Sequence, residues 1–340
     1  MNQFKTILVT GGTGFIGSSL VPKLVAKGYN VILPTRRLAS ARHLQMLPTV
    51  EVVQTPMKSA EELAPYLSRS DVVINLIGIL HGRPGKRPQH NLDNDPRYRA
   101  AEDPYGPDFG AMHVEYPKAL AELALNSGVK RMLQMSAYGT HLPKAELPSM
   151  YLRSKAAGEK ATLSILGLAT TVFRPSVVFG EGDNFLNFFA KIQALPIMLP
   201  LARGSCKFQP VYVEDVTSAM VNAIENKATY GKAYDLLGPE TFTLRELVKL
   251  SGRLAGHERP VIGLPDFVGE IQAGIFEMLP GPTIMSVDNF NSLKVDSAAP
   301  EGYAMASELG VTPQALSVIA PTYLSKTAPR FSVERAKAGR

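Results

Sequence analysis

Ser136, Tyr151 and Lys155 are the residues of this chain whose types and spacing could do chemistry. Tyr151 and Lys155 stand four positions apart at the start of a predicted helix over 151–166, so both side chains face the same way. A nearby ammonium lowers the pKa of a phenol, so Tyr151 could take or give a proton. The segment 130–139 is predicted as a strand and its exit, and Ser136 ends that strand, where its hydroxyl would orient a carbonyl or hydroxyl group. A Tyr-x-x-x-Lys pair also arises by chance on helix surfaces. Whether this pair belongs to a catalytic site therefore depends on the elements predicted around it.

A glycine-rich turn near the N-terminus supplies the strongest of these elements. The segment TGGTGFIG over 10–17 joins a continuous apolar run, typical of a strand buried on both faces, to a predicted helix over 15–27. Gly11 allows a tight turn, and Gly14 allows backbone amides to approach a pyrophosphate. Gly17 allows tight packing of the helix on the sheet. The helix N-terminus then faces the phosphates with its partial positive charge. The turn therefore predicts a dinucleotide cofactor and, at the tyrosine, hydride chemistry.

The residues at the end of the second predicted strand, 30–36, indicate which dinucleotide binds. An NAD site offers a carboxylate there, which accepts a hydrogen bond from the ribose 2′-hydroxyl. This chain has Thr35, Arg36 and Arg37 instead. A guanidinium pairs with a 2′-phosphate and can stack on adenine, so Arg36 favours NADP(H) over NAD(H). The alternative is that both arginines are merely solvated at a loop.

The carboxyl ends of the other strands complete the expected site, because sheets of this kind bind ligands at that edge. There Lys155 would also hold the nicotinamide ribose. The residues expected to contact the dinucleotide are Gly11, Thr13, Gly14, Phe15, Ile16, Gly17, Arg36, Leu76, Ile77, Gly78, Tyr151, Lys155, Pro175, Val177 and Val178. The expected catalytic residues are Ser136, Tyr151 and Lys155.

The alternation of strands and helices predicts the fold class. Apolar, strand-like runs cover 5–10, 30–36, 50–54, 71–78, 130–139 and 169–175, with helical segments between them. This spacing implies parallel strands with right-handed crossovers, and thus an α/β fold: a doubly wound parallel Rossmann sheet with a smaller C-terminal α/β lobe. We expect the dinucleotide-binding domain over 1–175, joined by a return of the chain over 209–238. The smaller substrate or partner lobe would cover 176–340 and end in a basic tail.

Two segments depart from this alternation. Residues 81–110 hold five prolines and few large aliphatic residues, which excludes a regular element and predicts a long loop at the ligand edge of the sheet. Residues 264–281 place six apolar residues on one helical stripe, which predicts a helix in a core or facing a partner, with packing in the second lobe as the main expectation. They are Phe267, Val268, Ile271, Ile275, Phe276 and Leu279. A groove for an isoprenoid tail is the alternative.

Composition excludes several classes of protein. The net charge is +6, but residues 326–340 hold five basic residues against one acidic, so the basic character belongs to a tail and no nucleic-acid partner is expected. The apolar runs fall short of the ~20 residues of a membrane span. One cysteine excludes a disulfide scaffold, and the six histidines lack metal-ligand spacing, so we expect no metal. The N-terminus shows no leader, which favours the cytoplasm, with a peripheral position at the inner membrane as the alternative.

The motifs together resemble the short-chain dehydrogenase/reductase superfamily, in its extended or atypical branch. In chain order they are TGGTGFIG (10–17), DVVINLIG (71–78), Ser136, YLRSK (151–155), RPSVVFG (174–180) and QPVYVED (209–215). Within that superfamily the chain is most similar to the dehydrogenase-like accessory subunit of respiratory complex I, alpha-subcomplex subunit nine, and its bacterial relatives. The segments that carry this similarity are MHVEYPKAL (112–120), YLRSKAAGEK (151–160), FRPSVVFGEGDNFLNFFA (173–190) and LPGPTIMSVDNFNSL (279–293).

This resemblance implies a tightly held NADPH and a role in quinone metabolism or in the assembly of electron-transfer complexes. It also implies a respiratory complex or a membrane surface as a partner, and a quinone-like or small carbonyl substrate. The superfamily often has an asparagine near Met112 or His113; none stands there in this chain, so the proton relay would be incomplete. We therefore expect an NAD(P)H-binding protein of accessory-subunit type. The alternative is an active NADP(H)-dependent oxidoreductase, or an epimerase/dehydratase, that uses a Ser-Tyr-Lys site.

Overall fold

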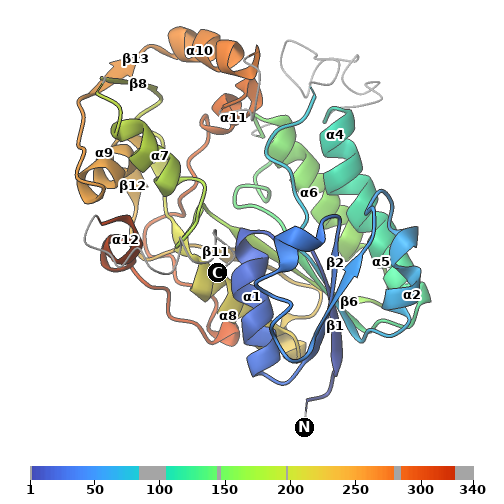
Figure 1. The fold of residues 1–340 in the computed structure, drawn as a ribbon. Helices are drawn as coiled ribbons and strands as arrows, with labels where there is room; N and C mark the ends of the chain where they lie inside the picture. The colour runs from blue at the N-terminus through green and yellow to red at the C-terminus, as the bar shows by residue number, and fades with distance from the viewer. Residues whose placement is uncertain (1, 84–104, 144–146, 197, 279–284, 326–340) are drawn as a thin grey trace, which may run out of the picture.

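The computed structural model describes residues 2–83, 105–143, 147–196, 198–278 and 285–325. A seven-stranded parallel sheet runs in the order β11-β6-β5-β4-β1-β2-β3 (Figure 1). Its strands are β1 (Thr6–Thr10), β2 (Asn30–Thr35), β3 (Val50–Gln54), β4 (Val72–Asn75), β5 (Arg131–Met135), β6 (Ala169–Pro175) and β11 (Ala233–Leu236). This is the strand order of a doubly wound Rossmann sheet with one further strand at its edge, so the predicted fold class is confirmed.

Helices cover both faces of this sheet, because its central strands are apolar on both sides. The fully buried side chains of β1 and β4 include Ile7, Leu8, Val9, Val72, Val73 and Ile74. On one face, α1 (Phe15–Ala26) packs against α8 (Val213–Ala223). On the other face lie α2 (Ala64–Leu67), α5 (Tyr116–Asn126) and α6 (Met150–Leu163) (Figure 1). Short 3-10 turns cover Leu38–Ala41, Glu61–Leu63, Lys227–Thr229 and Ser307–Leu309.

The strand order reverses between β1 and β4, and open sheets of this kind bind ligands at the carboxyl ends of the strands where the order reverses. The glycine turn that follows β1 lies there, against the chain that leaves β4. A Cβ on Gly11 would lie 3.0 Å from the carbonyl carbon of Leu76 and 3.1 Å from the amide nitrogen of Ile77. Close backbone approach therefore requires glycine at position 11, and its φ of +74° is also one that other residues rarely adopt.

The segment after β4 corrects part of one prediction. Most of the irregular loop expected over 81–110, residues 84–104, lies outside the described residues. Its last residues are regular: α4 covers Pro107–Phe109, and a π-helical turn, Gly110–Glu115, leads directly into α5. The prediction was wrong here because a proline in the first turn of a helix loses no hydrogen bond, so Pro107 begins a helix instead of breaking one.

The remaining elements gather in a smaller lobe beside the sheet, at the upper left of Figure 1. They are β7 (Val178–Phe179), α7 (Leu186–Gln193), β8 (Leu199–Ala202), β9 (Lys207–Phe208), β10 (Val211–Tyr212), β12 (Phe242–Thr243), α9 (Leu244–Leu254), β13 (Val261–Leu264), α10 (Asp266–Met278), α11 (Val287–Ser292) and α12 (Leu316–Leu324). A separate apolar core, centred on Phe179, Phe189 and Leu247, holds α7, α9 and α12 together. None of the helices that the structure describes combines the length and apolar character needed to cross a bilayer.

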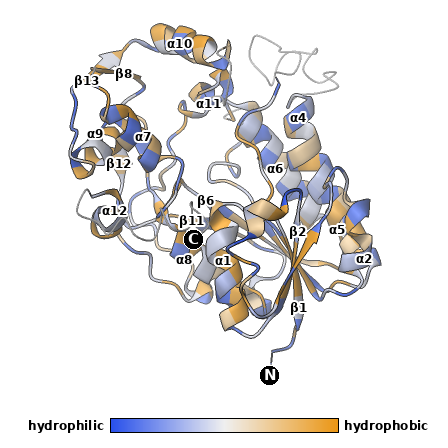
Figure 2. Cartoon of the chain, in the orientation of Figure 1, coloured by the Kyte–Doolittle hydropathy of each residue, from blue (hydrophilic) through white to orange (hydrophobic). Residues whose placement is uncertain are grey.

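The structure also corrects the prediction for α10, the helix that carries the apolar stripe. We expected its apolar stripe to pack inside the lobe, yet Phe267, Ile271 and Ile275 are 67%, 60% and 54% exposed, while Val268 and Phe276 are half-buried. Leu279 lies outside the described residues. The buried face of α10 carries Gly269 and Ala273 instead. A Cβ on Gly269 would overlap the side chain of Ala202, so the helix lies too close to β8 for any larger residue. Figure 2 shows the resulting apolar colour along α10.

Candidate functional site

The glycine turn and the N-terminus of α1 form a cradle of backbone groups. Gly14 is the N-cap residue of α1, and no side chain caps the helix there or adds a negative charge to its first turn. The partial positive charge of the helix end is thus left for a ligand. A Cβ on Gly17 would overlap the backbone of Gly12, so the third glycine lets α1 pack on the turn itself and not, as we expected, on the sheet. The residues present fit a pyrophosphate, because side chains are kept away from the amides that would bind it.

Arg36 follows β2 directly and is exposed. The buried Thr35 shapes the turn after the strand, since its hydroxyl donates to the carbonyl of Arg37 at 3.1 Å. In the part of the chain that the structure describes, the Arg36 guanidinium forms no ion pair. Its position at the carboxyl edge, one strand away from the glycine turn, is where the ribose of a dinucleotide would be read.

Tyr151 and Lys155 lie in the first two turns of α6, close to the chain that leaves β4. Burial lowers the pKa of the Lys155 ammonium to about 8, and the neighbouring Glu159 opposes that shift. Burial raises the pKa of the Tyr151 hydroxyl to about 12. This differs from our expectation that the lysine would lower the pKa of the tyrosine, because loss of solvent dominates at both groups. The Lys155 Nζ donates to the carbonyl of Met135 at 3.5 Å.

His113, which sequence reasoning left unassigned, holds the ring of Tyr151 in place. Its ring centroid lies 5.5 Å from that of Tyr151, edge to face, and Phe109 lies 6.2 Å from Tyr151 on a neighbouring side. The backbone N–H of Ile79 donates to His113 Nε2 at 3.0 Å. Nδ1 therefore carries the proton and donates to Ser154 Oγ at 2.8 Å, which donates in turn to the carbonyl of Tyr151.

Both ring nitrogens of His113 are thus used within the protein. Burial, together with the nearby Lys155 charge, lowers the pKa of His113 to about 2. The imidazole is neutral at physiological pH, with no free donor or acceptor for a proton relay. The π-helical turn that carries it packs tightly on α6, since a Cβ on Gly158 would overlap the carbonyl oxygen of His113.

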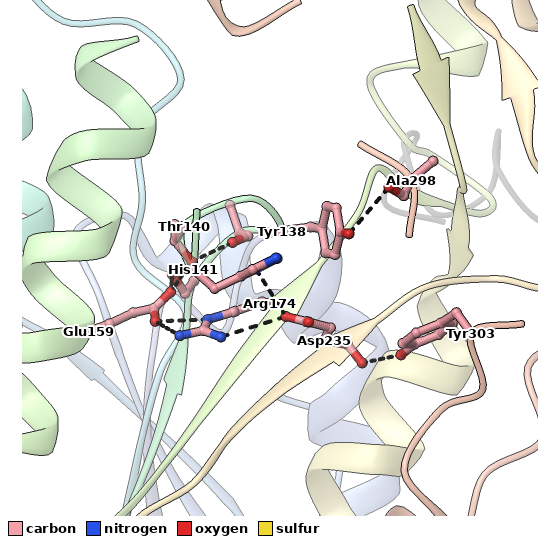
Figure 3. A network of polar contacts seen from close by, with 10 residues as sticks. Tyr138, Thr140, His141, Glu159, Arg174, Asp235, Ala298 and Tyr303 are labelled. Atoms are coloured by element: carbon pink, nitrogen blue, oxygen red, sulfur yellow. Dashed lines mark hydrogen bonds and ion pairs between the residues drawn. The ribbon is translucent and has the colours of Figure 1, made fainter. Parts of the chain in front are cut away.

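The Ser136 hydroxyl is hydrogen-bonded to a buried carboxylate. Its hydroxyl donates to Glu159 Oε1 at 2.5 Å, and the Thr140 hydroxyl donates to the same oxygen. The Arg174 Nε and Nη2 atoms lie 2.8 and 2.6 Å from Glu159 Oε2 (Figure 3). Since its proton is used on Glu159, Ser136 presents only oxygen lone pairs to a ligand. The structure brings Tyr151 and Lys155 to one place but directs the Ser136 hydroxyl toward Glu159.

Glu159 and Arg174 were missed by sequence reasoning, although a signal was present. Glu159 follows Lys155 by four residues and so lies on the same side of α6. Arg174 is a charged residue inside the predicted strand 169–175. Its Nη1 lies 3.8 Å from Asp235 Oδ1, and His141 Nδ1 lies equally far from that oxygen (Figure 3). Burial raises the pKa of Asp235, and the neighbouring His141 and Arg174 oppose the shift. The network joins the carboxyl ends of β5, β6 and β11.

The other predicted contact residues also lie at the carboxyl edge. Leu76, Ile77 and Gly78 leave β4, and a Cβ on Gly78 would lie 2.9 Å from the Lys155 Nζ. Pro175 ends β6 and is buried, while Val177 and Val178 are half-buried at the start of β7. Fold and turn together define a Rossmann-type dinucleotide-binding protein.

Comparison with known proteins agrees with this class. The model of an NAD(P)H-binding family matches residues 11–184, and that of the 3-beta hydroxysteroid dehydrogenase/isomerase family matches residues 128–242. The mitochondrial NADH dehydrogenase [ubiquinone] 1 alpha subcomplex subunit 9 of Arabidopsis thaliana is 30% identical over 326 residues, covering 91% of this chain and 74% of the relative. The mouse protein of the same name, from Mus musculus, is 29% identical over 91% of this chain and 77% of its own length.

The chain therefore belongs to the NAD(P)H-binding family that includes these alpha subcomplex subunit 9 proteins. Among solved structures, a UDP-glucose 4-epimerase from Thermotoga maritima has a TM-score of 0.63 at 21% identity, covering 94% of this chain and 97% of the epimerase. At that identity the likeness shows a shared fold.

Proposed function

We propose that the chain holds NADP(H) as a lasting part of its structure and serves as an accessory protein of respiratory electron transfer. The observation that carries the cofactor choice is the exposed Arg36 at the end of β2, on the same edge as the uncapped N-terminus of α1. A 2′-phosphate would give this guanidinium a charged partner, whereas the 2′-hydroxyl of NAD(H) would not.

Three observations support a binding role over turnover. The Ser136 proton is used on Glu159, so Ser136 has none to donate to a substrate carbonyl. His113 stands near the position where related enzymes carry an asparagine, and both of its ring nitrogens are already bonded. The phenol of Tyr151 has a raised pKa, which disfavours the phenolate that proton abstraction needs.

The named relatives suggest where this binding protein works. Because they are subunits of an NADH dehydrogenase that acts on ubiquinone, we propose a respiratory complex at the inner membrane as its partner. Residues 1–175 together with 209–238 would form the cofactor domain, and the rest of 176–340 the partner lobe. The exposed apolar residues of α10 lie in that lobe.

Replacing Arg36 tests the choice of cofactor. Arg36→Ala should weaken NADPH binding by about 10- to 100-fold and leave NADH binding nearly unchanged, since a charge-assisted hydrogen bond contributes ~1.5–3 kcal/mol. Calorimetric titration of both nucleotides measures this. Arg69→Ala is the control, because it also removes one positive charge, but from the amino-terminal end of β4, opposite to the carboxyl ends where the cofactor would bind. Equal losses for NADPH and NADH in Arg36→Ala would exclude a contact with the 2′-phosphate.

An active oxidoreductase is the second candidate function. Tyr151 and Lys155 support it, because they share one face of α6 near the chain leaving β4. We expect purified protein to show no sustained NADPH oxidation with short-chain ubiquinones or small carbonyl compounds. Tyr151→Phe should then keep the NADPH affinity within about twofold. Sustained oxidation that falls by about 10²–10⁴-fold in Tyr151→Phe would instead establish Tyr151 as a general acid and reject the binding-only role.

A further inference from the structure

The short helix α11 belongs to the smaller lobe but bonds to the first turn of α6. Asp288 on α11 is 7% exposed. Its Oδ1 accepts a hydrogen bond from the backbone N–H of Met150 at 2.7 Å, and its Oδ2 accepts one from the N–H of Tyr151 at 3.0 Å. One carboxylate therefore spans the two lobes and ends on the residue that carries the candidate phenol.

These bonds complete the N-terminal cap of α6. A helix leaves its first N–H groups without partners inside the helix. In α6 the Ser149 hydroxyl accepts from the N–H of Leu152, and the carbonyl of Ser149 accepts from the N–H of Arg153. The N–H groups of Met150 and Tyr151 remain, and Asp288 accepts from both. A carboxylate here also meets the partial positive charge of the helix end, which favours the contact further.

The next residue of α11 holds the opposite side of the site. The Asn289 Nδ2 donates to the carbonyl of Leu80 at 3.0 Å, on the chain that leaves β4. The preceding residue, Ile79, donates to His113, and Gly78 lies beside the Lys155 ammonium. Two consecutive side chains of one helix are thus bonded to α6, which carries Lys155, and to the β4 exit, whose Gly78 lies beside the Lys155 ammonium.

We propose that Asp288 and Asn289 form an interlobe clasp through which the smaller lobe holds the Tyr151–Lys155 end of the cofactor site in its binding geometry. Asp288 is a positioning residue in this proposal, since it acts through the first turn of α6 and not on a ligand. The inference rests on the proposed cofactor function.

Coupling through such a clasp is reciprocal. If the clasp favours the geometry that binds NADPH, bound NADPH must favour the closed clasp by the same free energy. Cofactor binding should therefore slow amide hydrogen exchange in α11, although α11 lies outside the Rossmann sheet. A helix cap with a purely structural role would not produce this response.

Hydrogen–deuterium exchange and NADPH titration of the full chain test the proposal. Asp288→Ala should speed exchange of the first-turn amides of α6 and weaken NADPH binding by about 5- to 10-fold, which is the helix-stability cost of one lost cap transmitted in full to the cofactor site. In wild-type protein, NADPH should slow exchange over 287–292, and this protection should be lost in Asp288→Ala. Asp288→Asn, which keeps the shape and one acceptor oxygen, should fall between the two and provides a second variant if the alanine protein folds poorly.

Asp296→Ala is the matched control. Its carboxylate accepts from the N–H of Lys207 at 2.8 Å within the smaller lobe, so its loss should change neither α6 nor NADPH affinity. Unchanged exchange of α6 in Asp288→Ala and Asp288→Asn would overturn the clasp. Faster exchange with unchanged NADPH affinity would overturn its positioning role. If wild-type protein binds no NADPH, the proposed function fails, while exchange in the cofactor-free proteins still decides whether Asp288 holds α6.

Discussion

Gly14→Val should abolish measurable NADPH binding while leaving the cofactor-free fold intact. Gly14 has an extended backbone, φ −82° and ψ −178°, which valine adopts without strain. A Cβ there would meet the Gly11 carbonyl oxygen at 3.2 Å, a contact that a small shift relieves. The isopropyl group would stand in front of the amides at the start of α1. Losing two amide–phosphate bonds of ~1.5–3 kcal/mol each weakens binding by more than about 100-fold.

Thermal unfolding with and without NADPH measures this directly. Wild-type protein should gain stability from NADPH because the ligand binds the native state, and Gly14→Val should show no shift. Gly17→Val is the informative contrast: its Cβ would overlap the Gly12 backbone, so it should lower the melting temperature of the cofactor-free protein itself. A normal NADPH shift in Gly14→Val would place the pyrophosphate elsewhere.

The glycine turn shows what could be predicted from sequence alone. A buried strand such as β1 is a continuous apolar run, and its partners in a parallel sheet follow from the alternation with helices. Gly11 and Gly14 lie three positions apart in one short turn, so their sequence spacing alone indicates how the backbone folds there. The fold class and the place of the cofactor turn were therefore accessible. The role of Gly17 was not, since which backbone it touches depends on the angle at which α1 leaves the turn.

The α10 prediction failed for a different physical reason. Apolar periodicity indicates which face of a helix prefers to leave water, and Phe267 and Ile271 mark that face. It does not report how close the neighbouring element lies. Here α10 approaches β8 at the distance set by Gly269 and Ala202, so the small residues are buried and the large ones are left outside. Such an exposed face is what a partner lobe would offer.

The site around Ser136 was only partly predictable, because its partners come from separate elements. Ser136 follows β5 directly, Glu159 lies within α6 and Arg174 lies near the end of β6. Their meeting depends on the register between β5 and β6, in which Met135 pairs with Phe173. From sequence alone, a serine at a strand end is predicted to contact a ligand. Only the strand register shows that a buried carboxylate lies within hydrogen-bond distance of it.

Arg174→Ala should destabilise the protein by ~3–5 kcal/mol, the usual effect of leaving one partner of a buried ion pair uncompensated. Glu159 is 5% exposed and would keep its negative charge away from water without the guanidinium that now donates to it twice. Urea denaturation of cofactor-free protein measures the change. Lys232→Ala is the control, because it breaks the exposed Lys232–Glu308 pair, and such pairs contribute less than about 1 kcal/mol.

The double variant Arg174→Ala/Glu159→Gln separates loss of the charge pair from loss of packing. A neutral amide at position 159 still accepts from Ser136 and Thr140 through its oxygen and needs no counter-charge. Most of the stability lost in Arg174→Ala should therefore return in the double variant. If it does not, the arginine stabilises the protein mainly through packing against β11, and the buried charge of Glu159 contributes little to the loss.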